Sequence, residues 1–222
     1  MKVFEATTLA GLELKNRIVM APMTRSRAID NVPNNLMKEY YAQRSGAGLI
    51  LSEATAISPN GTGYPRIPGA YTDEQLEGWK NIVEGIHAKG GKFFVQLFHT
   101  GRVSALLNLP KGAETIAPSV VPLREMEMYT DEEGMQPHDI PREMTTDDIK
   151  QVQEEYVTAS IKLIEAGIDG IEVHGANGYL LEQFLDPKTN LRSDQYGGDY
   201  KNRARFVLET TQKVAQAIGS NK

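Results

Sequence analysis

The sequence predicts an α/β protein built on a parallel sheet, with strands and helices alternating along the chain. Short apolar runs occur at four places, amphipathic stretches separate them, and the runs lack the alternation typical of strands with one solvent-exposed face. The predicted strands are Arg17–Ala21, Gly48–Ser52, Lys92–Leu97 and Gly170–His174. Repeated strand–helix order favours parallel strands joined by crossover helices.

The predicted helices begin at polar capping residues and end at glycines, as helices in soluble proteins commonly do. Their approximate bounds are Asn34–Gly46, Thr72–Gly90, Thr145–Gly167 and Asp199–Gly219. The second begins with a capping box, Thr72 to Gln75, and places Trp79 on its apolar face. Thr146 is an alternative cap for the third helix.

The whole chain, residues 1–222, is expected to form a single domain. Residues 1–16 are predicted to form a hairpin cap, in which Val3–Thr7 pairs with Leu12–Leu14 across a turn at Gly11. The first three strands fall within 17–99, and helix three, strand four and helix four within 145–222. Residues 100–144 lack periodicity, and a loop of that length is typical of a functional lid.

The composition excludes several classes of function. Hydrophobic residues make up 40% of the chain and charged residues 24%, as in ordinary soluble proteins. The net charge of −5 argues against a nucleic-acid or anionic-membrane partner, and no apolar run is long enough to span a bilayer. With no cysteine, disulfides and thiolate chemistry are excluded, and a cytoplasmic location is expected. No histidine pair has helical metal-binding spacing, so no metal is expected.

Polar side chains cluster where the predicted strands end, which is where parallel α/β proteins bind ligands. Thr24 follows the first strand, Gln96 ends the third, and His174, Asn177 and Tyr179 follow the fourth. No strand end carries a carboxylate pair or a Ser–His–Asp set, so hydrolysis is poorly supported.

The residues after the fourth strand suit a reaction that builds negative charge on a neutral molecule. His174 and Asn177 can donate hydrogen bonds to one oxygen, and Tyr179 stays protonated at neutral pH and can act as a general acid. None carries hydride, so redox chemistry would require a cofactor. Each residue alone also has a structural explanation: a buried histidine, a left-handed turn at Asn177, and a core tyrosine.

Seven stretches in a fixed order resemble the Old Yellow Enzyme family of flavin-dependent ene-reductases. They are APMTR (21–25), YYAQR (40–44), SEAT (52–55), GYP…PG (63–69), QLFHTGR (96–102), HGANGYLLEQFLDP (174–187) and NLRSDQYGG (190–198). The family fold is a (β/α)8 barrel. The resemblance implies a TIM-barrel-type N-terminal (β/α)4 half, with an N-terminal β-hairpin and a long loop after strand three.

The resemblance implies a role for each matching residue. The segment along the flavin corresponds to Ala21, Pro22, Met23 and Thr24, and contacts to the isoalloxazine correspond to Ala54 and Gln96. His174 and Asn177 match the pair that binds the substrate's carbonyl or nitro oxygen, and Tyr179 matches the proton donor. Tyr64 and Phe98 match aromatic residues of the substrate pocket, where many relatives carry tryptophan in place of Phe98.

The implied activity is the reduction of α,β-unsaturated small molecules by FMN, which NADH or NADPH reduces. A complete barrel has eight strand–helix units, whereas this chain has four. We therefore expect FMN binding to be weak or absent without a C-terminal half, and expect pairing with that complementary half-barrel or self-association.

Two other interpretations remain. The first is a non-catalytic, self-associating half-barrel that binds no flavin. The second is a flavodoxin-like binding module, which APMTR disfavours because it lacks the glycine of a phosphate-binding loop.

Overall fold

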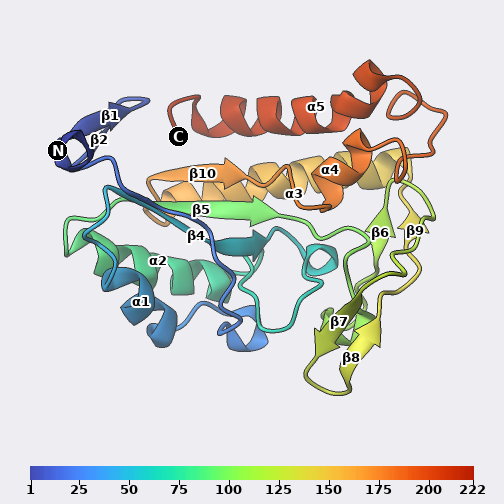
Figure 1. Ribbon diagram of the computed structural model, residues 1–222, viewed down its shortest axis with the longest axis horizontal. Helices are drawn as coiled ribbons and strands as arrows, with labels where there is room; N and C mark the ends of the chain where they lie inside the picture. Colours follow the sequence, from blue (N-terminus) through green and yellow to red (C-terminus); the bar gives the residue numbers. More distant parts are fainter.

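A computed structural model describes residues 1–222 and contains one four-stranded parallel sheet (Figure 1). Its strands, in chain order, are β3 (Val19–Met20), β4 (Leu49–Ala56), β5 (Phe93–Phe98) and β10 (Gly170–Val173). The spatial order is β10-β5-β4-β3, so each new strand adds beside the preceding one. This confirms the predicted α/β class and all four predicted strands. The outer edges of β3 and β10 are both unpaired.

A helix follows each of these strands along the chain. These helices are α1 (Asn35–Ala42), α2 (Asp73–His87), α3 (Thr146–Glu165) and α5 (Tyr200–Ile218). Contacts join α1 to α2, α2 to α3 and α3 to α5, so the helices form one continuous layer around the sheet (Figure 1). No helix combines the length and apolar character needed to cross a bilayer.

Polar caps begin the helices where the sequence predicts. Thr72 and Gln75 form the expected capping box, in which the Thr72 hydroxyl accepts from the Gln75 backbone N–H. Of the two candidates for α3, the structure selects Thr145, whose hydroxyl accepts from the backbone N–H of Asp148. These bonds satisfy amide groups that the first helical turn leaves free.

One cluster of 27 buried residues forms the core between the sheet and the helix layer. Its largest member, Trp79 of α2, is fully buried as predicted and donates its indole N–H to the Gly69 carbonyl at 3.0 Å. In β5, Phe93, Val95 and Leu97 belong to this core. Because side chains alternate along a strand, Gln96 points to the opposite face of the sheet.

The N-terminal hairpin is present, but its first strand lies later than predicted. β1 (Thr7–Leu9) pairs with β2 (Leu12–Leu14), whereas Lys2–Phe4 forms a short 3₁₀ turn. The turn contains Ala10 and Gly11, both at positive φ, and so takes two residues between the strands. The two-residue connection sets the register, which moves the first strand away from Val3.

The long segment after β5 is more ordered than the sequence predicts. It contains the hairpin β7 (Glu127–Thr130) and β8 (Gly134–Pro137), and the two-residue strands β6 (Ile116–Ala117) and β9 (Arg142–Glu143), which pair with each other. The strand β7 lies within the acidic run Glu125–Glu133, whose acidic side chains are exposed. Strands of two to four residues are too short to produce a periodic pattern. The sequence also missed α4 (Leu180–Leu185), a six-residue helix directly after Tyr179.

Candidate functional site

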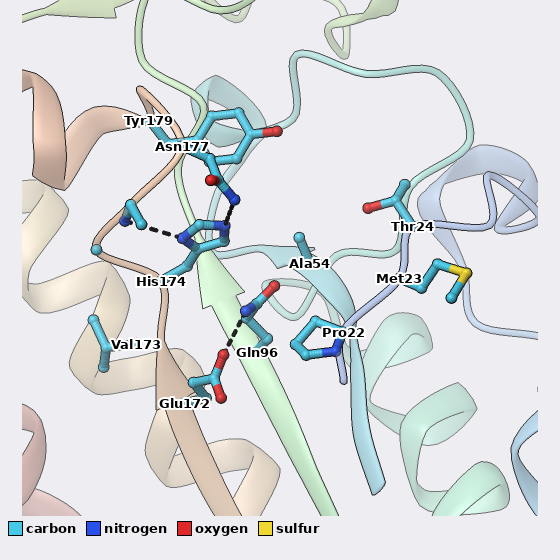
Figure 2. Close-up of a pocket in the computed structure, with 12 residues that line it drawn as sticks. Pro22, Met23, Thr24, Ala54, Gln96, Glu172, Val173, His174, Asn177 and Tyr179 are labelled. Atoms are coloured by element: carbon cyan, nitrogen blue, oxygen red, sulfur yellow. Dashed lines mark hydrogen bonds between the residues drawn. The ribbon is translucent and has the colours of Figure 1, made fainter. Parts of the chain in front are cut away.

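A cavity of about 430 Å³ lies at the carboxyl ends of the four parallel strands (Figure 2). All four strands, or the residues just after them, contribute to its lining. The structure brings together the following predicted site residues: Pro22, Met23, Thr24, Ala54, Gln96, His174, Asn177 and Tyr179. Ala21, Tyr64 and Phe98 lie outside the lining, and Glu172 and Val173 line the cavity although the sequence did not single them out.

His174 and Asn177 point into the cavity from the turn after β10. His174 Nδ1 accepts a hydrogen bond from the Ala176 backbone N–H at 3.2 Å, which leaves the proton of the neutral imidazole on Nε2. Asn177 Nδ2 lies 3.5 Å from that Nε2. Both atoms are then donors, so they suit one acceptor placed between them. Burial lowers the pKa of His174, which keeps the ring neutral at pH 7.

Backbone strain and α4 together set the shape of this turn. Asn177 has φ +59° and Gly178 has φ +77°. Asn177 therefore adopts the left-handed backbone conformation that the sequence analysis gave as a structural explanation for an asparagine here. The Gly178 N–H donates to Glu182 at 2.7 Å, and Gln183 Nε2 donates to the Gly178 carbonyl at 2.7 Å. Two side chains of α4 therefore hold the turn that presents Asn177.

Tyr179 sits in an aromatic cluster beside the cavity. Its hydroxyl donates to the Tyr64 hydroxyl at 3.0 Å, and its ring meets the rings of His174 and Phe98 edge-on, at centroid distances of 5.1 and 5.2 Å. Phe98 in turn stacks on His174 at 6.3 Å. Tyr64 and Phe98 thus contact the predicted site residues without lining the cavity. Burial raises the pKa of Tyr64 well above its ordinary value.

The floor of the cavity is a row of residues across three neighbouring strands. Gln96 of β5 is in register with Ala54 of β4 on one side and with Glu172 of β10 on the other. Gln96 is only 7% exposed, and its Nε2 donates to Glu172 Oε1 at 2.5 Å (Figure 2). A charged residue inside the apolar run GIEVH was the feature of the sequence that could have identified Glu172.

The segment from Ala21 to Arg25 has no regular secondary structure, and a buried carboxylate holds it. Glu53, 1% exposed, accepts from the Arg25 backbone N–H at 3.2 Å and from the Tyr41 hydroxyl at 3.1 Å. Burial raises the pKa of Glu53. Glu53 belongs to the SEAT stretch, but its role as an anchor for this segment was not predicted. Its contacts fix Thr24 and its neighbours at the rim of the cavity.

Fold and site together define a class: a parallel (β/α) protein whose strand ends line one cavity with hydrogen-bonding groups and small apolar side chains. The sequence model of the NADH:flavin oxidoreductase / NADH oxidase family matches residues 2–222. The chain belongs to this family, and the resemblance to the Old Yellow Enzyme family is confirmed.

Curated relatives and solved structures agree with this assignment. The chain is 44% identical to 12-oxophytodienoate reductase 7 of Oryza sativa subsp. japonica over 224 residues, which cover 99% of this chain and 56% of that protein. It is similar to morphinone reductase, with a TM-score of 0.95 and 47% identity over 99% of this chain and 60% of that one. The old yellow enzyme homologue from Zymomonas mobilis gives a TM-score of 0.94 at 40% identity, over 100% of this chain and 61% of that one. The chain thus spans a little over half the length of the curated relatives it matches.

Proposed function

We propose that this chain carries the substrate-binding and protonating groups of an FMN-dependent NAD(P)H oxidoreductase that reduces C=C bonds activated by a carbonyl or nitro group. The observation that carries the proposal is the convergence of two donors, His174 Nε2 and Asn177 Nδ2, 3.5 Å apart, beside the Tyr179 hydroxyl. Two donors aimed at one point suit an oxygen that gains negative charge during a reaction.

The residues present fit a flavin. Pro22 and Ala54 give the cavity small apolar side chains suited to the face of a planar ring, and Gln96 offers an amide to a polar ring edge. The cavity volume lies within the range of about 300–1,000 Å³ common for small-molecule sites. We propose that Ala21, Pro22, Met23, Thr24, Ala54 and Gln96 hold the FMN ring. When bound, FMN supplies the hydride-carrying chemistry that no side chain provides, with NADH or NADPH as reductant.

The chain's own groups then have separate tasks. His174 and Asn177 bind the substrate oxygen and stabilise the charge that develops on it, which polarises the conjugated C=C bond. The Tyr179 hydroxyl donates a proton to the α-carbon. When the Tyr179 O–H turns toward the α-carbon, the Tyr64 hydroxyl can donate across the same 3.0 Å contact and hold the Tyr179 oxygen in position. Phe98 supports the rings of both His174 and Tyr179.

We further propose that residues 1–222 act as one domain that needs a complementary set of strands for full activity. Two sheet edges are unpaired, and Val19 of β3 is 49% exposed. An unpaired edge is a template for another chain. The same edges favour a second candidate, a self-associating half-barrel that binds no flavin.

Flavin retention separates the two candidates. The purified chain is mixed with FMN and desalted, and its visible absorption spectrum is recorded with and without a complementary C-terminal half-barrel. Retained flavin supports the oxidoreductase. The difference in retained flavin with and without the added half-barrel measures how much of the flavin site that half contributes. Absence of flavin under both conditions supports the non-catalytic half-barrel.

Enone reduction tests the roles of the site residues in the flavin-loaded protein. His174→Ala and Asn177→Ala are each expected to weaken enone binding by up to about tenfold, since each removes one hydrogen bond to the carbonyl oxygen. Tyr179→Phe is expected to slow enone reduction while leaving reduction of the flavin by NAD(P)H intact. If Tyr179→Phe slowed both reactions equally, the protonation role would be wrong.

A further inference from the structure

The hydrogen bond between Gln96 and Glu172 determines which polar group the cavity floor presents to a ligand. Both residues lie on the cavity floor, in register on adjacent strands β5 and β10. The Gln96 backbone is fixed as well, because its N–H donates to Ser52 Oγ of β4 at 3.0 Å. With the backbone fixed, the orientation of the Gln96 side-chain amide decides which of its two ends faces the cavity.

Glu172 decides that orientation. An ionised carboxylate only accepts hydrogen bonds, so the Gln96 amide must turn its Nε2 toward Glu172. Its carbonyl oxygen then faces the cavity, as Figure 2 shows. No lysine, arginine or histidine forms an ion pair with Glu172, so no other group competes with Gln96 for the carboxylate.

We propose that Glu172 is a positioning residue that fixes the Gln96 amide and so makes the cavity floor select planar ligands carrying an N–H donor at the facing edge. The imide N–H of a flavin ring is such a donor, so the inference rests on the proposed function and deepens it. With the amide reversed, the floor would present N–H groups and favour a carbonyl edge instead. Charge-assisted hydrogen bonds are stronger than neutral ones, which gives the carboxylate control of the amide.

The first arm of the test compares FMN with N3-methyl-FMN, in which the imide N–H is replaced by a methyl group. Dissociation constants are measured by quenching of flavin fluorescence for the wild-type chain, Glu172→Gln and a control, Glu84→Gln, each alone and with the complementary half-barrel added. Glu84 is an exposed carboxylate on α2, remote from the cavity. The substitution Glu172→Gln keeps the shape of the side chain but lets either amide take either orientation.

We expect wild type and Glu84→Gln to prefer FMN over the methylated flavin by about tenfold or more, as one hydrogen bond to an acceptor would give. In Glu172→Gln this preference should fall to about threefold or less. Steric exclusion of the methyl group alone would persist in Glu172→Gln, so an unchanged preference would overturn the inference.

The second arm needs no flavin. The side-chain amide of Gln96 is observed by ¹H–¹⁵N NMR and assigned by its loss in Gln96→Ala. One amide proton should resonate downfield in wild type and Glu84→Gln, and move upfield in Glu172→Gln. An unmoved resonance would refute the positioning role whether or not flavin binds. If no variant bound flavin but the resonance moved, the proposed function of the chain alone would fail while Glu172 kept its positioning role.

Discussion

At the scale of single residues, His99 shows how the fold fixes a charge state behind the site. The ring is fully buried next to β5, and its Nδ1 accepts from the Gly101 backbone N–H at 3.0 Å. Its Nε2 has no hydrogen-bond partner. Burial lowers the pKa of His99 to about 3, because the interior offers a protonated ring no compensating acceptor.

The stability of the chain should therefore fall in acid partly through His99. Between its unfolded pKa of about 6.5 and its folded value of about 3, the unfolded state binds the extra proton. Stability from this group is fully present above pH 6.5 and declines by up to about 1.4 kcal/mol per pH unit as pH falls toward 3. Urea unfolding at pH 7 and pH 5 should show a smaller difference for His99→Asn than for wild type. Equal differences would contradict the prediction.

Gly101 leaves room for the side chain of Gln183, which supports the turn at Gly178. It has φ +60°, and a Cβ placed there would lie 2.1 Å from Oε1 of Gln183, the residue that holds the Gly178 carbonyl. Gly112 also has positive φ, +87°, but open space around it. Gly112→Ala should cost only the backbone strain of about 1–2 kcal/mol.

Gly101→Ala should cost more than Gly112→Ala, by roughly 1 kcal/mol or more, because Gln183 must also move. Thermal unfolding of the two variants measures the difference. Hydrogen exchange of the Gly178 amide should be faster in Gly101→Ala but not in Gly112→Ala. In Gly101→Ala, the displaced Gln183 side chain would no longer bond the Gly178 carbonyl. Equal unfolding temperatures for the two variants would show that Gln183 moves at no cost.

At the scale of elements, the N-terminal cap of α3 both begins the helix and contacts a neighbouring element. The cap of α3 also connects to the long segment before it, since Arg142 of β9 pairs with Asp148, the third residue of the helix, at 2.8 Å. Asp148 thus serves both the cap and an ion pair, and its hydrogen bonds lower its pKa to about 2. One residue links the two-stranded β6–β9 ladder to the helix layer.

Thr145→Ala should destabilise the chain by about 0.5–2 kcal/mol, because it leaves the Asp148 N–H without its cap. Thr146→Ala is the matched control, since Thr146 is the first helical residue and caps nothing. Denaturant unfolding of both variants gives the comparison. A larger loss in Thr146→Ala would mean that the helix begins one residue later than the structure shows.

At the scale of the whole molecule, the two unpaired edges of the sheet are expected to favour self-association. Each edge strand, β3 and β10, has one free side, and barrels normally remove such edges by closing. The purified chain should therefore associate as concentration rises. Analytical ultracentrifugation should detect species larger than 24.6 kDa. A monomer at all concentrations would contradict this prediction.

Val19→Lys places a charge on the β3 edge and should weaken association, as charged edges do in natural sheets. Leu36→Lys, at an exposed position of α1, is the control and should leave it unchanged. Equal effects of the two substitutions would point to general surface charge rather than to the edge.

The sequence by itself determined the strand–helix order, the caps of the helices, the buried face of α2 and the family. These properties depend on local patterns: apolar runs, capping residues and motifs that stay contiguous along the chain. It also singled out eight of the twelve cavity-lining residues. Five of them follow or end predicted strands, since parallel strands bring their carboxyl ends to one edge of the sheet, and the family resemblance added Pro22, Met23 and Ala54.

Tertiary structure alone decided the rest. The Gln96–Glu172 bond joins residues 76 positions apart through strand register. Likewise, the hydroxyls of Tyr64 and Tyr179 meet across 115 positions. The buried carboxylate of Glu53 acquires its role only because Tyr41 and the Arg25 backbone fold against it. Short strands such as β6 and β9 form because a distant partner pairs with them, and local sequence carries no record of that partner.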